Sequence, residues 1–213
     1  MDALLPVDPE VLHLDPDLPG SPFPEEVEAA LARIERSVNA GLSLDDVMQC
    51  VWEATTPILP HDRIGLAFVE NDGARVVARY SKAAYEGLRL GVGYSAGLAG
   101  STLQAILDSG RPRIIRDLAA YLERHPESVS TRILLLEQIA SNLTLPLRVE
   151  SRPVGFLFFS SRRPNAFHEE HARILLAILD RIAQAVEKAW IIQRLTDANQ
   201  WYFSMLGFIS HEF

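Results

Sequence analysis

Ile64-Gly-Leu-Ala-Phe-Val69 and Arg75-Val-Val-Ala-Arg-Tyr80 flank the turn signal Asn71-Asp-Gly73, a combination that predicts two antiparallel strands joined as a hairpin. Side chains alternate between the two faces of a strand, so we expect the first segment to divide its residues between two environments. The two sets are Ile64, Leu66 and Phe68 on one face and Gly65, Ala67 and Val69 on the other.

Further strand signals follow this hairpin in the sequence. Leu143 to Val149 and Val154 to Phe159 predict a second hairpin around Glu150-Ser-Arg-Pro153. Residues 88–98 predict a glycine-rich strand that runs into a loop, and Arg113-Ile-Ile-Arg116 predicts a short strand. Together these patterns predict an antiparallel sheet of six segments.

Helical patterns surround the strands. Pro24 and two following glutamates suit a first turn, and Ser43 is a good N-cap for a second helix that stops at Pro57. Ser101 can cap a short helix over 102–109 that stops at Gly110, and residues 118–138 predict a mostly helical crossover. Separate helical and antiparallel strand regions of this kind predict an α+β domain.

The overall composition excludes several classes of protein. Of the 213 residues 48% are hydrophobic, which is typical of a globular chain, and the net charge of −8 argues against a nucleic-acid partner. The single cysteine, Cys50, excludes a disulfide framework and a metal site built on several thiolates. The sequence has no apolar run of the roughly 18 residues that a membrane span needs and no basic secretory signal. We therefore expect a cytoplasmic protein without a metal.

The two ends of the chain differ from its middle. Six prolines within residues 1–24 predict an extended leader. After Asn165-Ala-Phe-His168 a long helix is predicted, with a heptad register through Leu175, Ile178, Ile182, Ala185, Ala189, Ile192, Thr196, Asn199, Phe203 and Leu206. A helix of this length outruns one small domain, so we expect a homodimer that pairs through the N- and C-terminal helices.

The order of these motifs resembles the GAF domain, a small-molecule sensor fold, over roughly residues 25–190. The matching segments are Gly41-Leu-Ser-Leu-Asp-Asp-Val47, Gly110-Arg-Pro with Asp117, Ser141-Asn-Leu-Thr-Leu-Pro-Leu147, Gly155 and Phe167-His-Glu-Glu170. The resemblance implies a leader at 1–24, a sensor domain at 25–168 whose closing helix continues to about 190, and a signalling helix at 169–213.

In this family small molecules sit on one face of the sheet, under the segments between the third strand and the crossover. The resemblance therefore implies a cleft whose residues here would be Tyr80, Tyr94, Ser95, Ser101, Arg113, Arg116, Asp117, Asn142 and Thr144. Arg113 and Arg116 cannot both point inward if their segment alternates. For each residue, a structural role as cap or surface group is an equal alternative.

The family's known chemistries leave the ligand unidentified. A covalent bilin is not expected, because Cys50 lies outside the crossover, and a single cysteine argues against a methionine sulfoxide reductase. The cyclic-nucleotide signature lacks its lysine in Asn165-Ala-Phe167. Haem is not favoured: His125 lies where an axial ligand could reach, but a solvated histidine is the simpler interpretation.

Met205-Leu-Gly-Phe-Ile-Ser-His-Glu-Phe213 resembles the phosphoacceptor box of sensor histidine kinases. A neutral imidazole is a competent nucleophile near neutral pH, and an adjacent carboxylate can accept its ring proton. The resemblance implies that His211 is the phosphoacceptor and Glu212 the base.

These motifs predict the sensory input region of a two-component sensor histidine kinase, with a response regulator as partner of the whole kinase. Without a glycine-rich nucleotide loop, the chain is not expected to phosphorylate itself. The alternative is a ligand-free GAF module that serves only as a dimerisation spacer. A third hypothesis, a stand-alone enzyme, has no catalytic constellation to support it. A cleft plugged by Phe or Leu side chains would favour the spacer, and an open cavity would favour the sensor.

Overall fold

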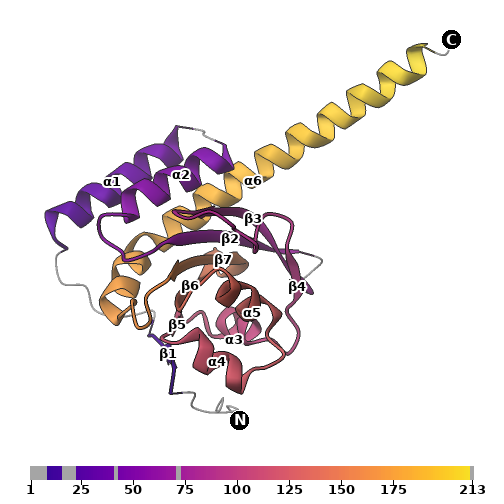
Figure 1. Ribbon diagram of the computed structural model, residues 1–213. Helices are drawn as coiled ribbons and strands as arrows, with labels where there is room; N and C mark the ends of the chain where they lie inside the picture. The colour runs from indigo at the N-terminus through magenta and orange to yellow at the C-terminus, as the bar shows by residue number, and fades with distance from the viewer. Residues whose placement is uncertain (1–8, 16–22, 41–42, 71–72, 212–213) are drawn as a thin grey trace.

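The fold is built on one antiparallel sheet (Figure 1). The computed structural model describes residues 9–15, 23–40, 43–70 and 73–211, and for residues 202–211 it describes the backbone alone. Among these residues the sheet has seven strands in the spatial order β1 (Val11–His13), β5 (Arg113–Ile115), β6 (Ser141–Val149), β7 (Arg152–Ser161), β2 (Arg63–Glu70), β3 (Arg75–Ala83) and β4 (Ser95–Gly97).

The seventh strand was not expected from the sequence. It comes from the proline-rich leader, where Val11–His13 lie between prolines and pair antiparallel with β5. Another strand, β4, is shorter than the predicted segment 88–98. Gly87 and Gly93 adopt positive φ values of 86° and 89°, which interrupt an extended strand. The predicted turn Asn71-Asp72 lies outside the described residues.

The alternation expected for β2 is confirmed. Ile64, Leu66 and Phe68 lie in the main core on one face, whereas Ala67 belongs to a separate cluster on the other. A β-bulge between Leu66 and Ala67 pairs Leu66 with Tyr80 and Ala67 with Ala78. Arg79 is therefore the extra residue of β3 at this point.

Helices cover the two faces of the sheet unequally (Figure 1). One face carries α1 (Glu25–Asn39), α2 (Leu44–Thr55) and the long α6 (Glu169–His211), and the other carries the shorter α3 (Thr102–Ser109), α4 (Leu118–Arg124) and α5 (Val129–Leu136). The predicted caps are confirmed, since the hydroxyl of Ser43 accepts from the amide of Asp46 in a capping box and Ser101 caps α3.

The first half of α6 forms part of the domain core. Leu175, Ile178 and Ile182 are at most 1% exposed, and they pack with apolar residues of the sheet, α1 and α2. The heptad register over these residues therefore reflects burial inside one chain and not a seam between two. The two patterns are alike over a few turns, because a helix lying on a sheet also needs apolar residues at spacings of three and four. No described helix is long and apolar enough to span a membrane.

Candidate ligand-binding site

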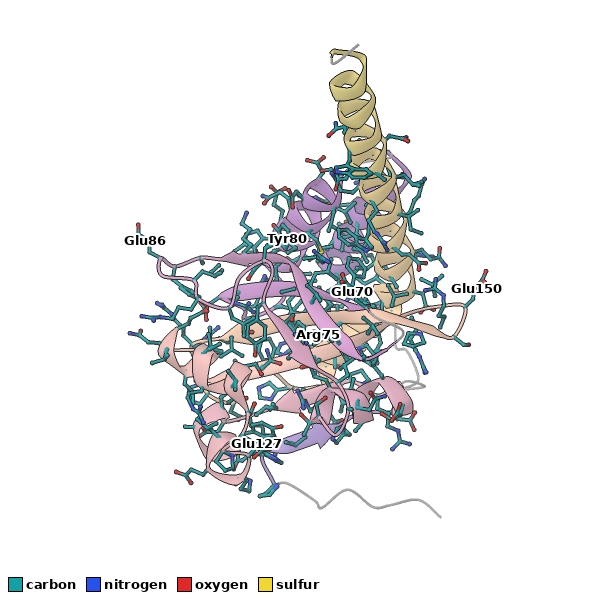
Figure 2. All side chains as sticks on the ribbon, turned by 90° about the vertical axis from the view of Figure 1, so that its right-hand side faces the viewer. Glu70, Arg75, Tyr80, Glu86, Glu127 and Glu150 are labelled. Atoms are coloured by element: carbon teal, nitrogen blue, oxygen red, sulfur yellow. The ribbon has the colours of Figure 1, made fainter. Side chains whose placement is uncertain are left out.

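The face of the sheet opposite α6 holds a cavity of about 670 Å³. Its floor is formed by residues of β2, β3, β6 and β7, and its sides by β4, β5 and the segments α3, α4 and α5. In Figure 2, Glu127 marks the segment between α4 and α5 on this side, while Glu86 and Glu150 lie at loop tips and point away from the domain. The volume is typical of small-molecule sites.

Five of the residues predicted for a cleft line this cavity with side chains on its face of the sheet or in its flanking segments. Tyr94 hydrogen-bonds with Ser130, and burial raises the pKa of its phenol. The hydroxyl of Ser95 accepts from Arg75. The five lining residues are Tyr94, Ser95, Ser101, Arg113 and Asn142.

Three predicted residues do not line the cavity. Arg116 is exposed, because it lies three positions beyond Arg113 and therefore on the opposite side of the chain. Asp117 caps α4, where its carboxylate accepts from the amides of Ala119 and Ala120. Thr144 is fully buried beneath the lining and donates to the side-chain oxygen of Asn142 at 2.8 Å.

Tyr80 occupies a mixed position. It contributes to the cavity wall, but the bulge aligns it with Leu66. Its side chain therefore packs against the core on the face that α1, α2 and α6 cover. Figure 2 shows Tyr80 on the side of the sheet nearer α1, α2 and α6. Burial and the charge of Asp45 on α2 raise the pKa of its phenol. Simple alternation along β3 would turn the Tyr80 side chain fully toward the cavity, and the bulge changes its orientation because it adds one residue to the strand.

Arg113 is the most unusual group in the cavity. It is only 6% exposed, its Nη1 donates to the hydroxyl of Thr102 at 2.6 Å, and its guanidinium lies 5.9 Å from the Tyr121 ring centre. Burial lowers the pKa of Arg113, while Tyr121 acts in the opposite direction through charge and a hydrogen bond. Its partners in the described part of the chain are hydroxyls, and its Nε is buried without a hydrogen bond.

The second buried arginine of the cavity has a carboxylate partner. Arg63 lies with its Nε 3.6 Å from Glu137, and it also donates to the carbonyl of Leu90 at 2.6 Å. Glu137 accepts from the amides of Arg89 and Leu90 and from the hydroxyl of Tyr85. Burial lowers the pKa of Arg63, and Glu137 opposes that effect. This network fixes the segment after β3 to the end of α5, and so closes one side of the cavity.

The family model of the GAF domain matches residues 41–187, which is more than half of the chain. The chain belongs to the GAF domain family. It is therefore a module of the sensory and signalling type. No curated protein matches it.

Several solved GAF domains share the fold. One from a cyanobacterial phytochrome, with bound phycoerythrobilin, has a TM-score of 0.62 and 15% identity over 80% of this chain and 100% of that chain. One from the phosphoenolpyruvate-protein phosphotransferase of Coxiella burnetii gives 0.63 and 18% over 79% and 97%. One from a two-component sensor histidine kinase of Bacillus halodurans gives 0.59 and 17% over 71% and 98%.

The residues weighed for cofactors are separated in this GAF domain. Cys50 lies on α2, across the sheet from the cavity, and its thiol contacts the carbonyl of Arg33 at 3.7 Å. His125 does line the cavity, where its ring stacks on Tyr121 at 4.3 Å. Within the described ranges, no group of three His, Cys, Asp or Glu side chains could hold a metal ion.

Sequence reasoning missed four polar residues around the cavity of the GAF domain. Arg63 and Glu137 each adjoin an apolar run, and a single charge beside buried segments is a signal for a buried ion pair. Thr102 and Tyr121 carry no comparable signal, because hydroxyls are common at helix starts and on helices.

His211, the residue predicted to be a phosphoacceptor, lies at the far end of α6. This helix includes His211 as its last residue, whereas Glu212 and the side chain of His211 lie outside the described residues. At ~1.5 Å per residue the 43 residues of α6 extend about 65 Å. One helix therefore joins the core of the GAF domain to residue 211.

Proposed function

We propose that the chain is the sensory input region of a two-component sensor histidine kinase. A small ligand binds in the cavity, and its presence alters the arrangement of α6, which carries His211 as phosphoacceptor with Glu212 as base. The observation that carries this proposal is the continuity of α6 from the domain core to residue 211. In this reading residues 1–24 are a leader, 25–168 the sensor and 169–213 the signalling helix of a cytoplasmic kinase that serves a response regulator.

The cavity favours a sensor over a ligand-free spacer. A space of about 670 Å³ holds many more atoms than a few waters would need, and its wall combines apolar side chains with hydroxyls and a buried guanidinium. A domain kept only for dimerisation gains nothing from such a void, because filling it with side chains would add stability.

A contact at the exit of α6 supports the relay. Trp190 stacks on Phe68 of β2 at 5.3 Å, and the guanidinium of Arg79 lies 4.6 Å above its ring. Ala67 precedes Phe68 on β2 and Ala78 precedes Arg79 on β3, and both alanines line the cavity on the other face of the sheet. A movement of these strands on ligand binding would therefore bear directly on the residue at which α6 leaves the domain.

The exposed part of α6 supports pairing with a second copy of the chain. Ile191, Ile192 and Leu195 are 50%, 47% and 61% exposed, although all are large and apolar. They follow the buried residues of the same helix. Ile192 belongs to the predicted heptad register, which continues to residue 206, and Ile191 and Leu195 lie beside that register. Two copies in parallel would cover these side chains and place both phosphoacceptors at one level.

The decisive test is phosphorylation in a protein that joins this chain to its kinase domain. Incubation with ATP and magnesium should give acid-labile, base-stable phosphate on the wild type, and His211→Gln should abolish the label without changing folding. Glu212→Gln should slow transfer by about two to four orders of magnitude without removing the acceptor. Persistent label on the His211→Gln protein would overturn the assignment of His211.

The ligand half of the proposal needs a separate measurement. Native mass spectrometry of the purified chain, with an absorption spectrum, should detect a retained molecule or a mass increase on addition of a binding compound. A domain that neither retains nor gains any mass across a broad metabolite library would favour the spacer.

A further inference from the structure

Arg113 is a buried positive charge without a counter-charge in the described part of the chain. Its two oxygen partners, on Thr102 and Tyr121, are neutral hydroxyls, and its Nε has no partner. Removing a guanidinium from water is unfavourable unless an anion and further hydrogen bonds replace its hydration. Hydroxyls supply hydrogen bonds but no charge, so the site is incomplete as it stands.

The ionisable side chains in and near the cavity do not neutralise Arg113. Glu137 is bound to Arg63 and to three further donors, and its side chain is fully buried in that network. Glu127 is 76% exposed and lies beside His125 at 3.7 Å. On the neighbouring strand β1, the residue paired with Arg113 is His13, which also offers no negative charge.

We propose that the cavity binds a small organic carboxylate, with its carboxylate on Arg113 and its apolar body in the rest of the cavity. This inference rests on the proposed ligand-binding role and names the class of ligand. Val76, Leu103, Leu118 and Phe158 provide an apolar wall for the body of the molecule. The Thr102 and Tyr121 hydroxyls hold the guanidinium in place, which lowers the entropy lost when the anion binds.

The charge of the site favours a carboxylate over a phosphate. One uncompensated guanidinium matches one negative charge, whereas a phosphate dianion would leave a second charge buried in a largely apolar cavity. Arg63 cannot supply the second positive charge without giving up Glu137. Arginine is also the residue best suited to a planar carboxylate, because its donors form a rigid fork.

Isothermal titration of the chain with matched pairs of compounds tests this inference. The probes are benzoate, 4-phenylbutyrate and octanoate, each compared with its uncharged amide. At least one carboxylate should bind, and its amide should bind at least about tenfold more weakly, as expected when a charged hydrogen bond is lost. In Arg113→Met the difference between acid and amide should disappear, while Arg113→Lys should retain part of it.

Two further measurements keep the result unambiguous. Arg116→Gln removes a charge three residues away outside the cavity and should leave the acid-to-amide ratio unchanged. The ligand-free Arg113→Met protein should be no less stable than the wild type in urea, because a buried unpaired charge has been removed. If Arg113→Met does not fold, Arg113→Lys with its reduced ratio provides the same test.

The outcomes separate this inference from the proposed function. Equal binding of acids and amides would overturn the carboxylate but leave a ligand-binding sensor in place. A ratio that Arg113→Met leaves unchanged would also overturn it. Failure of all three carboxylates at millimolar concentration would overturn it as well, and native mass spectrometry would then decide separately whether the cavity holds an uncharged molecule.

Discussion

At the scale of single residues, Gly155 shows how closely β7 approaches β2. A Cβ atom at this position would lie 2.1 Å from the carbonyl oxygen of Ala67, which is backbone and cannot rotate away. We expect Gly155→Ala to lower the free energy of unfolding by about 1–3 kcal/mol, the usual cost of overpacking. Urea denaturation measures this change. Gly97→Ala is the matched control, because nothing lies within 4 Å of its Cβ position, and equal losses in the two variants would contradict the prediction.

His61 gives the domain a dependence on pH. It lies between Trp52 and Phe159, and burial lowers its pKa from 6.5, although the Leu59 carbonyl and Asp62 oppose the shift. Below pH 6.5 the unfolded chain therefore binds more protons at this residue than the folded chain does. The free energy of unfolding should fall as the pH drops below 6.5, until the folded pKa is passed.

The comparison of His61→Phe with wild type isolates this effect. Phenylalanine keeps a ring between the two aromatic neighbours but cannot titrate, so the loss of stability between pH 7.5 and pH 5.5 should be smaller in the variant. Urea denaturation at both pH values measures it. An identical loss in both proteins would assign the acid sensitivity to other groups.

The candidate site was partly predictable at this scale. Arg113 and Asn142 lie on strands whose register follows from alternation, and the opposite orientations of Arg113 and Arg116 follow from their odd spacing. Tyr80 does contribute to the cavity wall, but the packing of its side chain against the core could not be predicted, because a bulge leaves no mark in a single sequence. Arg63 and Glu137 meet across 74 positions of sequence, and only the folded chain shows that their charges are paired.

At the scale of elements, the proposed dimer would pair through the exposed turns of α6, which carry Ile191, Ile192 and Leu195. Ile192→Asp with Leu195→Asp should convert the proposed dimer to a monomer, because one charge would enter an apolar seam and the other would lie at its border. Light scattering or sedimentation at high micromolar concentration measures the mass. A wild type that is monomeric under these conditions would contradict the prediction.

A matched pair of charges tests the face of the helix. Gln193→Asp with Gln200→Asp adds the same charge about a quarter of a turn from Ile192 and more than about a third of a turn from Leu195, and this variant should remain dimeric. Substitutions at Ile178 or Ile182 are unsuitable for this purpose, because both side chains lie in the domain core and their replacement would unfold the domain.

The ends of helices were predicted well where a capping side chain or a glycine marks them. Ser43, Ser101 and Gly110 mark helix ends through side-chain caps or a left-handed backbone, and the structure confirms each. The strand β1 was missed because three residues between prolines carry too little periodicity. Its extended form depends on hydrogen bonds with β5, a strand that is distant from it in the sequence.

At the scale of the whole molecule, Trp190 connects the sheet to the projecting helix. Trp190→Ala removes the contacts with Phe68 and Arg79, together worth about 1–2 kcal/mol. Hydrogen exchange should then become roughly tenfold faster in the turns of α6 around residue 190, with binding in the cavity unchanged. Trp201→Ala, on an exposed position of the same helix, should change exchange much less. Equal exchange in wild type and Trp190→Ala would contradict the prediction.

The pairing of β1 with β5 has a practical consequence for the whole domain. Without Val11–His13, β5 would become the outer strand of the sheet and present unpaired amides and carbonyls to solvent. Such an edge can recruit strands from other molecules. A proteolytic cut that removed Val11–His13 would therefore do more than shorten the chain: it would expose the unpaired edge of β5, the strand that carries Arg113, and trimmed preparations would aggregate.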